Sequence, residues 1–137
     1  MAKPSPDRVE SKNLEPERSV GEPVDVQRLF KLPVMRGKST VLLDLDQVVS
    51  IQADEHYSRV FTFDANYFCP ISVSELESRL DPDSFLRVHR SHIVNLNRAR
   101  SFERRNDQGI ILVDGTHPRS VPVSRSNVPR LRHALGL

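Results

Sequence analysis

The most informative stretch of this sequence runs from residue 85 to residue 100 and reads FLRVHRSHIVNLNRAR. Its segments 85–89 and 93–96 are rich in apolar, branched side chains and predict two short strands. The remaining residues are arginine, histidine, serine and asparagine, whose side chains can form hydrogen bonds with phosphate oxygens or base edges. This arrangement suits a turn that is anchored to a core by apolar side chains and presents polar groups to a nucleic acid.

Two of these polar residues have a second interpretation. His89 and Asn95 would also suit a role in satisfying buried backbone groups, which is a common use of such side chains in turn-rich β proteins. For these two residues the sequence favours neither role.

Short apolar runs precede this stretch from Thr40 onward. Residues 41–43 and 48–51 predict strands, and residues 57–63 alternate with the period of two that a strand requires. Turn-forming residues at 64–66 separate that strand from an apolar run at 67–69, which predicts a β-hairpin.

One short helix is predicted between these strands and the 85–100 stretch. Ser72 and Glu75 have the spacing of a capping box, and apolar residues follow at helical intervals from Val73. The helix should end at Asp81, because a residue before proline is disfavoured in the helical region.

Two more strands and a second helix are predicted near the C-terminus. Residues 110–113 and 120–123 are β-branched runs bounded by turn residues or prolines. The last segment can form a helix capped by Ser126, with Pro129 in the first turn, where its missing N–H costs little. The pattern as a whole is that of a mainly β protein with one or two short helices.

Length and composition indicate one folded domain that follows a polar tail. At 137 residues the chain has room for one domain with a modest core. Residues 1–34 hold few large apolar side chains and several prolines, so we expect a disordered N-terminal tail there and a domain over residues 35–137. No run of about 18 apolar residues and no signal peptide is recognisable, so we expect a cytoplasmic protein without a membrane partner.

The charge is unevenly distributed along the chain, although the net charge is only +2. Residues 31–86 hold five basic and nine acidic side chains, whereas residues 87–137 hold ten arginines and three acidic side chains. A basic C-terminal part of this kind favours a polyanion such as nucleic acid. It also suits an acidic protein partner, and that alternative stays open.

The residues needed for an enzyme or a metal site are not apparent in the sequence. Phosphate-binding glycine patterns and the HExxH and GxSxG motifs are absent. Cys69 is the only cysteine, and His89 and His92 lack a third ligand of suitable spacing, so we expect neither a metal nor another cofactor. A small hydrolase is therefore the least favoured function.

Three stretches of the chain resemble the LytTR-type DNA-binding domains of bacterial transcription regulators. They are VVSIQADEHY at residues 48–57, FLRVHRSHIVN at 85–95 and VPVSR at 121–125, and they occur in the order and spacing of that family. The resemblance covers about residues 35–135. It implies an elongated arrangement of small β-sheets in which loops, rather than a recognition helix, enter the major groove.

The same resemblance implies roles for individual residues. Base contacts would fall on Ser58, Arg90 and Arg125, and an arginine can bond the O6 and N7 atoms of guanine in bidentate fashion. Phosphate contacts would come from a larger set of polar residues, namely Tyr57, Arg59, His89, Ser91, Asn95, Arg98, Arg100 and Ser124.

These observations predict a sequence-specific transcription regulator that binds double-stranded promoter DNA, with two copies on repeated sites. Many proteins of the LytTR type join this domain to a receiver or another sensor, and no sensory domain is visible here. The chain would then be a standalone regulator, part of a larger regulator, or a module whose sensor is a separate protein. The alternative is a protein-interaction module, in which the basic face of the β scaffold meets an acidic partner.

Overall fold

The structure is a computed structural model, and it describes residues 27–137. The strands are β1 (Leu32–Arg36), β2 (Ser39–Leu43), β3 (Ser50–Asp54), β4 (Tyr57–Phe61), β5 (Asn66–Cys69), β6 (Phe85–His89), β7 (His92–Asn95), β8 (Ala99–Arg105), β9 (Gln108–Val113) and β10 (Arg119–Val123). The α-helices are α1 (Val73–Arg79) and α2 (Val128–Ala134), and short 3-10 turns occupy Leu45–Gln47, Leu96–Arg98 and Arg125–Asn127. Residues 1–26, which make up most of the predicted tail, lie outside the described residues.

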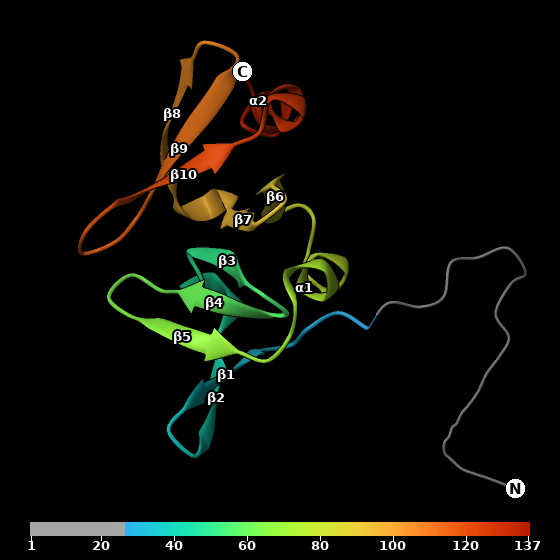
Figure 1. Cartoon of the computed structure of the whole chain (residues 1–137), viewed down its shortest axis with the longest axis vertical. Helices are drawn as coiled ribbons and strands as arrows, with labels where there is room; N and C mark the ends of the chain where they lie inside the picture. Colours follow the sequence, from blue (N-terminus) through green and yellow to red (C-terminus); the bar gives the residue numbers. More distant parts are fainter. Residues whose placement is uncertain (1–26) are drawn as a thin grey trace, which may run out of the picture.

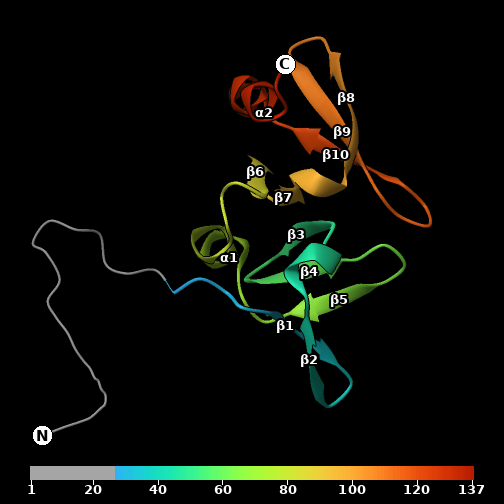
Figure 2. The ribbon, with the colours of Figure 1, turned by 180° about the vertical axis from the view of Figure 1, so that it is seen from behind.

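Two antiparallel sheets follow one another along the long axis of the molecule (Figure 1). The larger sheet has the strand order β2-β1-β5-β4-β3-β7-β6, and the smaller sheet has the order β10-β9-β8. Helix α1 lies beside the larger sheet, and helix α2 lies beside the smaller one, as the view from behind also shows (Figure 2). The predicted fold, an elongated and mainly β arrangement with short helices, is confirmed.

The hairpin of β6 and β7 contributes to two hydrophobic cores. Phe85 and Ile93 are buried in one core together with residues of α1, whereas Val88 and Val94 are buried in a second core with α2 and the smaller sheet. Successive residues of a strand point to opposite faces, so this hairpin is packed on both sides. The turn at its end therefore projects from a rigid support.

The folded domain starts earlier than the predicted residue 35. Strand β1 begins at Leu32, and the side chains of Leu32 and Val34 are fully buried. A proline within a short apolar run argues against a strand, and Pro33 stands between these two residues. Leu32 and Val34 are buried nevertheless, so packed structure is present before residue 35.

Strand β8 is a second element that the sequence analysis did not predict. Its sequence is ARSFERR, and Ala99 and Phe102 are its only partly buried residues. It forms one edge of the smaller sheet. Charged side chains on such an edge discourage pairing with another chain, and they also remove the apolar alternation by which strands are recognised.

Both helices are short, and their first turns differ. The Ser72 hydroxyl accepts a hydrogen bond from the N–H of Glu75 at 3.2 Å, as predicted for the cap of α1. Helix α2 begins at Val128 after Asn127, not after Ser126, and Pro129 lies in its first turn as predicted. Among residues 27–137, no helix has the length and apolar character that a membrane crossing would require.

Candidate nucleic-acid interface

The Arg90 turn, residues 89–92, joins β6 to β7. His89 pairs with His92 at the end of the hairpin, and the register shifts between Arg87 and His89. Arg90 and Ser91 form the tip, where the Arg90 side chain is exposed. The backbone N–H of Ala53 donates to the carbonyl of Ser91 at 2.8 Å, so the turn is also fastened to β3.

Ser91 links the two histidines of this turn. The Nδ1 atom of His89 accepts the backbone N–H of Ser91 at 3.2 Å. The Ser91 hydroxyl is hydrogen-bonded to Nδ1 of His89 at 2.9 Å and to Nδ1 of His92 at 3.0 Å. Burial, with the nearby His89 and Arg119, lowers the pKa of His92 to about 4, so its ring is neutral at pH 7.

The Arg125 turn, residues 124–127, joins β10 to α2. The N–H of Ser124 donates to the carbonyl of Val88 at 2.9 Å, and Asn127 Nδ2 donates to the Ser124 hydroxyl at 2.6 Å. The Arg125 side chain is 75% exposed, and its nearest carboxylate, that of Asp107, lies 3.9 Å away and is equally open to solvent. An exposed pair of this geometry is weak, so the Arg125 guanidinium is available to another anion.

An open groove runs between the two arginine turns. One part, of about 480 Å³, is lined by Glu77, Arg87, His89, Arg90, Ser124, Ser126, Asn127 and Arg130. The adjoining part, of about 440 Å³, shares His89, Ser124 and Ser126 with it and continues to Arg125 and Gln108. Nearly all of these side chains are hydrogen-bond donors or cations. The surface therefore suits a polyanion that carries hydrogen-bonding edges.

Residues 38–136 match the family described as LytTr DNA-binding domain. The chain belongs to the LytTR family. It is 45% identical over 109 residues to the CO-responsive transcriptional regulator RcoM of Rhodospirillum rubrum, and 31% identical over 104 residues to the transcriptional regulatory protein YpdB of Escherichia coli K12. Among solved structures it resembles a LytTr DNA-binding domain from Bacillus cereus, with a TM-score of 0.71 and 25% sequence identity.

The extent of these matches differs between the relatives. The match to the Bacillus cereus domain covers 80% of this chain and 99% of that domain. The matches to RcoM and YpdB cover 80% and 76% of this chain, but only 46% and 43% of those proteins. The chain thus spans a whole LytTR domain and less than half the length of these two regulators.

The structure places Ser58, for which the LytTR resemblance implies a base contact, inside the larger sheet. Ser58 is fully buried within β4, and its hydroxyl donates to the carbonyl of Ile71 at 2.6 Å. The exposed tip of the same hairpin is formed by Glu55 and His56 instead. Because Ala53 contacts Ser91, this tip lies beside the Arg90 turn. Of the two tip residues, His56 is the one without a negative charge, which a phosphate would repel.

Asn95 has the structural role that the sequence left open. Its side chain is buried, its Nδ2 donates to the carbonyl of Val48 at 2.8 Å, and its Oδ1 accepts the N–H of Asn97 at 3.0 Å. Both ends of the amide are therefore occupied within the LytTR fold, and the structure does not bring Asn95 into the groove with Arg90.

Two predicted phosphate-binding arginines lie away from the groove. Arg98 and Arg100 follow β7 at the end opposite to the Arg90 turn, and both form ion pairs with Asp114, at 3.9 and 3.6 Å. Arg98 also donates to the carbonyl of Asp46 at 2.8 Å. The structure does not bring these two side chains together with Arg90.

Tyr57 and Arg59 occupy one face of β4, near the Arg90 turn but not in the groove. The Tyr57 ring packs against Phe68 at 5.1 Å between centroids, and Arg59 donates to Asn66 at 3.0 Å. Both side chains remain partly exposed, so each keeps some freedom to reach a phosphate.

Several basic residues near Arg125 were not singled out from the sequence. Arg104, Arg132 and His133 line a cavity of about 410 Å³ together with Arg125. Arg132 could have been predicted from the sequence, because it lies one helical turn into the predicted C-terminal helix. Arg104 could not be found in this way, because strand β8 was not predicted.

Proposed function

We propose that this LytTR domain regulates transcription by reading a specific sequence of double-stranded DNA through the Arg90 and Arg125 turns. The observation that supports this proposal best is that both arginines are exposed while their turns are fastened to one support, by the bond from Ser124 to Val88. An arginine held in this way can form the bidentate contact to guanine in the major groove that gives the commonest specific recognition.

Phosphate contacts would surround these two base contacts. Ser91, Ser124 and His89 lie at the turns themselves, and Arg104 and Arg132 flank Arg125. Backbone-directed contacts of this kind fix the register of a protein on the duplex without reading its sequence. We add His56 as a contact in place of Ser58, because it stands exposed at the neighbouring hairpin tip.

Regulation is the further part of the proposal. The relative RcoM is named as a CO-responsive regulator, and this name describes a response to a signal. We propose that two copies of this chain bind repeated sites in a promoter, and that a sensor, in the same or another protein, controls this binding.

Selection of binding sites from random duplex DNA tests the proposal. The chain should enrich a defined sequence, and the enriched duplex should be bound more tightly than a scrambled duplex of equal length and composition. If no sequence is enriched while an acidic protein competes for the basic face, the protein-interaction alternative replaces this proposal.

A further inference from the structure

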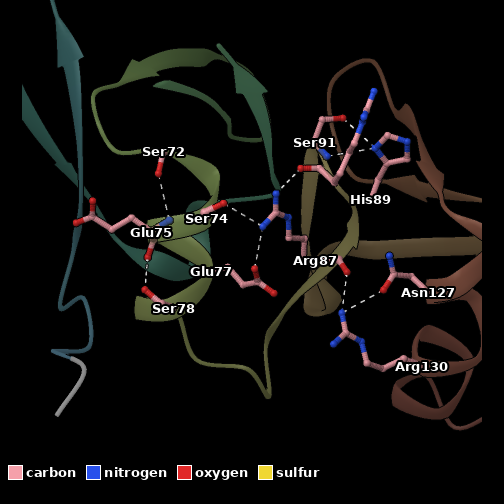
Figure 3. A network of polar contacts seen from close by, with 11 residues as sticks. Ser72, Ser74, Glu75, Glu77, Ser78, Arg87, His89, Ser91, Asn127 and Arg130 are labelled. Atoms are coloured by element: carbon pink, nitrogen blue, oxygen red, sulfur yellow. Dashed lines mark hydrogen bonds and ion pairs between the residues drawn. The ribbon is translucent and has the colours of Figure 1, made fainter. Parts of the chain in front are cut away.

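Arg87 lies on β6 between helix α1 and the Arg90 turn (Figure 3). Its Nη1 atom donates to Glu77 at 2.9 Å and to Ser74 at 3.3 Å, both on α1. Its other terminal nitrogen, Nη2, donates to the carbonyl oxygen of Arg90. One guanidinium thus joins a helix of the larger sheet to the tip of the turn.

The backbone of Arg87 is linked to the second turn as well. Its carbonyl accepts a hydrogen bond at 3.0 Å from Nη2 of Arg130 on α2, and the same nitrogen donates to Asn127 at 3.3 Å. Asn127 in turn donates to Ser124 at 2.6 Å. A continuous set of hydrogen bonds therefore runs from α1 through Arg87 to both arginine turns, and most of it is visible in Figure 3.

The ion pair of Arg87 with Glu77 is partly shielded from solvent. The Arg87 side chain is 23% exposed and the Glu77 side chain 44% exposed, and the 2.9 Å contact is a charge-assisted hydrogen bond. A guanidinium is planar and presents separate donors in two directions, so it can hold Glu77 and the Arg90 carbonyl at the same time. A lysine in its place offers a single ammonium and cannot span both.

We propose that Arg87 and Glu77 are positioning residues that determine DNA sequence specificity. Glu77 orients the guanidinium, and the guanidinium holds the backbone at Arg90 so that the Arg90 side chain enters the DNA groove at a fixed place. The inference rests on the proposed function of Arg90 and deepens it. Neither residue has to touch DNA for this role.

Glu77 gives a test in which electrostatics and positioning predict opposite results. Glu77 lines the groove. Replacing it by alanine removes a negative charge from that surface, which by electrostatics alone strengthens binding to every DNA. If Glu77 positions Arg87, Glu77→Ala instead weakens binding to the selected duplex by about fivefold to tenfold, the size of coupling expected within one hydrogen-bond network. Affinity for the scrambled duplex stays equal or rises slightly.

Glu75→Ala is the matched control. It removes the same charge from the same helix, and the Glu75 carboxylate pairs with Arg79 rather than with Arg87. Alanine is a good helix former, so both variants should fold, and their melting temperatures are compared to verify this. Glu75→Ala should leave the ratio of the two affinities unchanged. Glu77→Gln keeps an acceptor for Nη1 and should restore part of the lost specificity.

Arg87→Lys separates positioning from direct contact with DNA. If Arg87 is a positioning residue, Arg87→Lys weakens binding to the selected duplex by about tenfold. The dependence of binding on salt concentration stays unchanged. A phosphate-binding residue instead keeps its charge in the lysine variant, so both affinities and the salt slope stay close to those of the parent. That second result, or a Glu77→Ala variant that behaves like Glu75→Ala, would overturn the inference.

The same experiment distinguishes this inference from the proposed function. If the parent chain does not discriminate between the selected and scrambled duplexes, the proposed function fails. In a second outcome, the parent discriminates between the duplexes, Arg90→Ala lowers the ratio of affinities, and Glu77→Ala leaves it unchanged. The proposed function then stands, and only the positioning role is wrong.

Discussion

The backbone N–H of Ser124 donates a 2.9 Å hydrogen bond to the carbonyl oxygen of Val88, and this bond fastens the Arg125 turn to the strand that leads into the Arg90 turn. The two turns lie 35 residues apart along the chain, yet they share one support. Val88 itself is fully buried in the core that α2 and the smaller sheet complete. The spacing between the two arginines is therefore a property of the packed domain rather than of flexible loops.

Ser58 and His56 should respond to substitution in opposite ways. Ser58→Ala removes the hydroxyl that donates to Ile71 and leaves a partly buried carbonyl without that partner, so the free energy of unfolding should fall by about 1 kcal/mol. Its affinity for the selected duplex should not change. His56→Ala should leave stability unchanged. It should weaken DNA binding by about threefold, which corresponds to the net free energy of about one hydrogen bond. Denaturant titration and DNA titration of both variants check this, and a loss of DNA affinity confined to Ser58→Ala would restore the original assignment.

The dependence of binding on salt should separate two pairs of arginines. Arg104→Ala and Arg132→Ala should each make the slope of log K against log salt shallower by about one, as the loss of a phosphate contact does. Arg98→Ala and Arg100→Ala should leave the slope unchanged, because these side chains pair with Asp114 at the far end of the hairpin. Titrations at four salt concentrations measure the slopes. The reverse pattern would place the DNA on the Arg98 side of the domain.

His92 should make stability depend on pH. Its pKa is about 4 in the folded chain against 6.5 in the unfolded chain, so the unfolded chain binds more protons between these values. The stability that the neutral ring contributes is complete above about pH 6.5 and is lost as the pH falls toward 4. The free energy of unfolding of His92→Gln should therefore fall less steeply than that of the parent across this window. Parallel curves for the two proteins would contradict the assignment of a neutral, partly buried His92.

Arg28 should stabilise the end of helix α1. Its Nη1 donates to the carbonyl of Leu80 at 2.9 Å, and the N–H of Leu29 donates to the carbonyl of Arg79 at 3.1 Å. Carbonyls at the end of a helix lack partners within the helix, and a cation there also complements the helix dipole. Arg28→Ala should lower the free energy of unfolding by about 1 kcal/mol. Arg36→Ala, at an exposed site on β1, is the control, and equal stabilities of the two variants would contradict this role.

Much of the fold follows from local patterns in the sequence. The alternation in residues 57–63 marks β4, and the spacing of Ser72 and Glu75 marks the first turn of α1. Both signals are local, since they depend on periodicity and capping within a few residues. Strands β1 and β8 lack such a signal, because Pro33 interrupts one and charged side chains fill the other.

The site was less accessible to sequence reasoning than the fold. Motif position placed Ser58 on the DNA, but whether a strand residue points inward is decided by its register against its neighbours, and a shift by one residue reverses it. The role of Arg87 could not be predicted from the sequence, for a different reason. Its partners Glu77 and Arg130 lie 10 and 43 residues away along the chain, so their convergence depends on the tertiary structure.

Arg90 and Arg125 carry the central claim, and the most direct measurement of it is the ratio of affinities for the selected and the scrambled duplex. Arg90→Ala and Arg125→Ala should each weaken binding to the selected duplex by about 1–3 kcal/mol and change binding to the scrambled duplex much less, so that the ratio falls. Melting temperatures near that of the parent would show that both variants fold. If two such folded variants discriminate between the duplexes as well as the parent does, the two arginine turns do not read the DNA sequence.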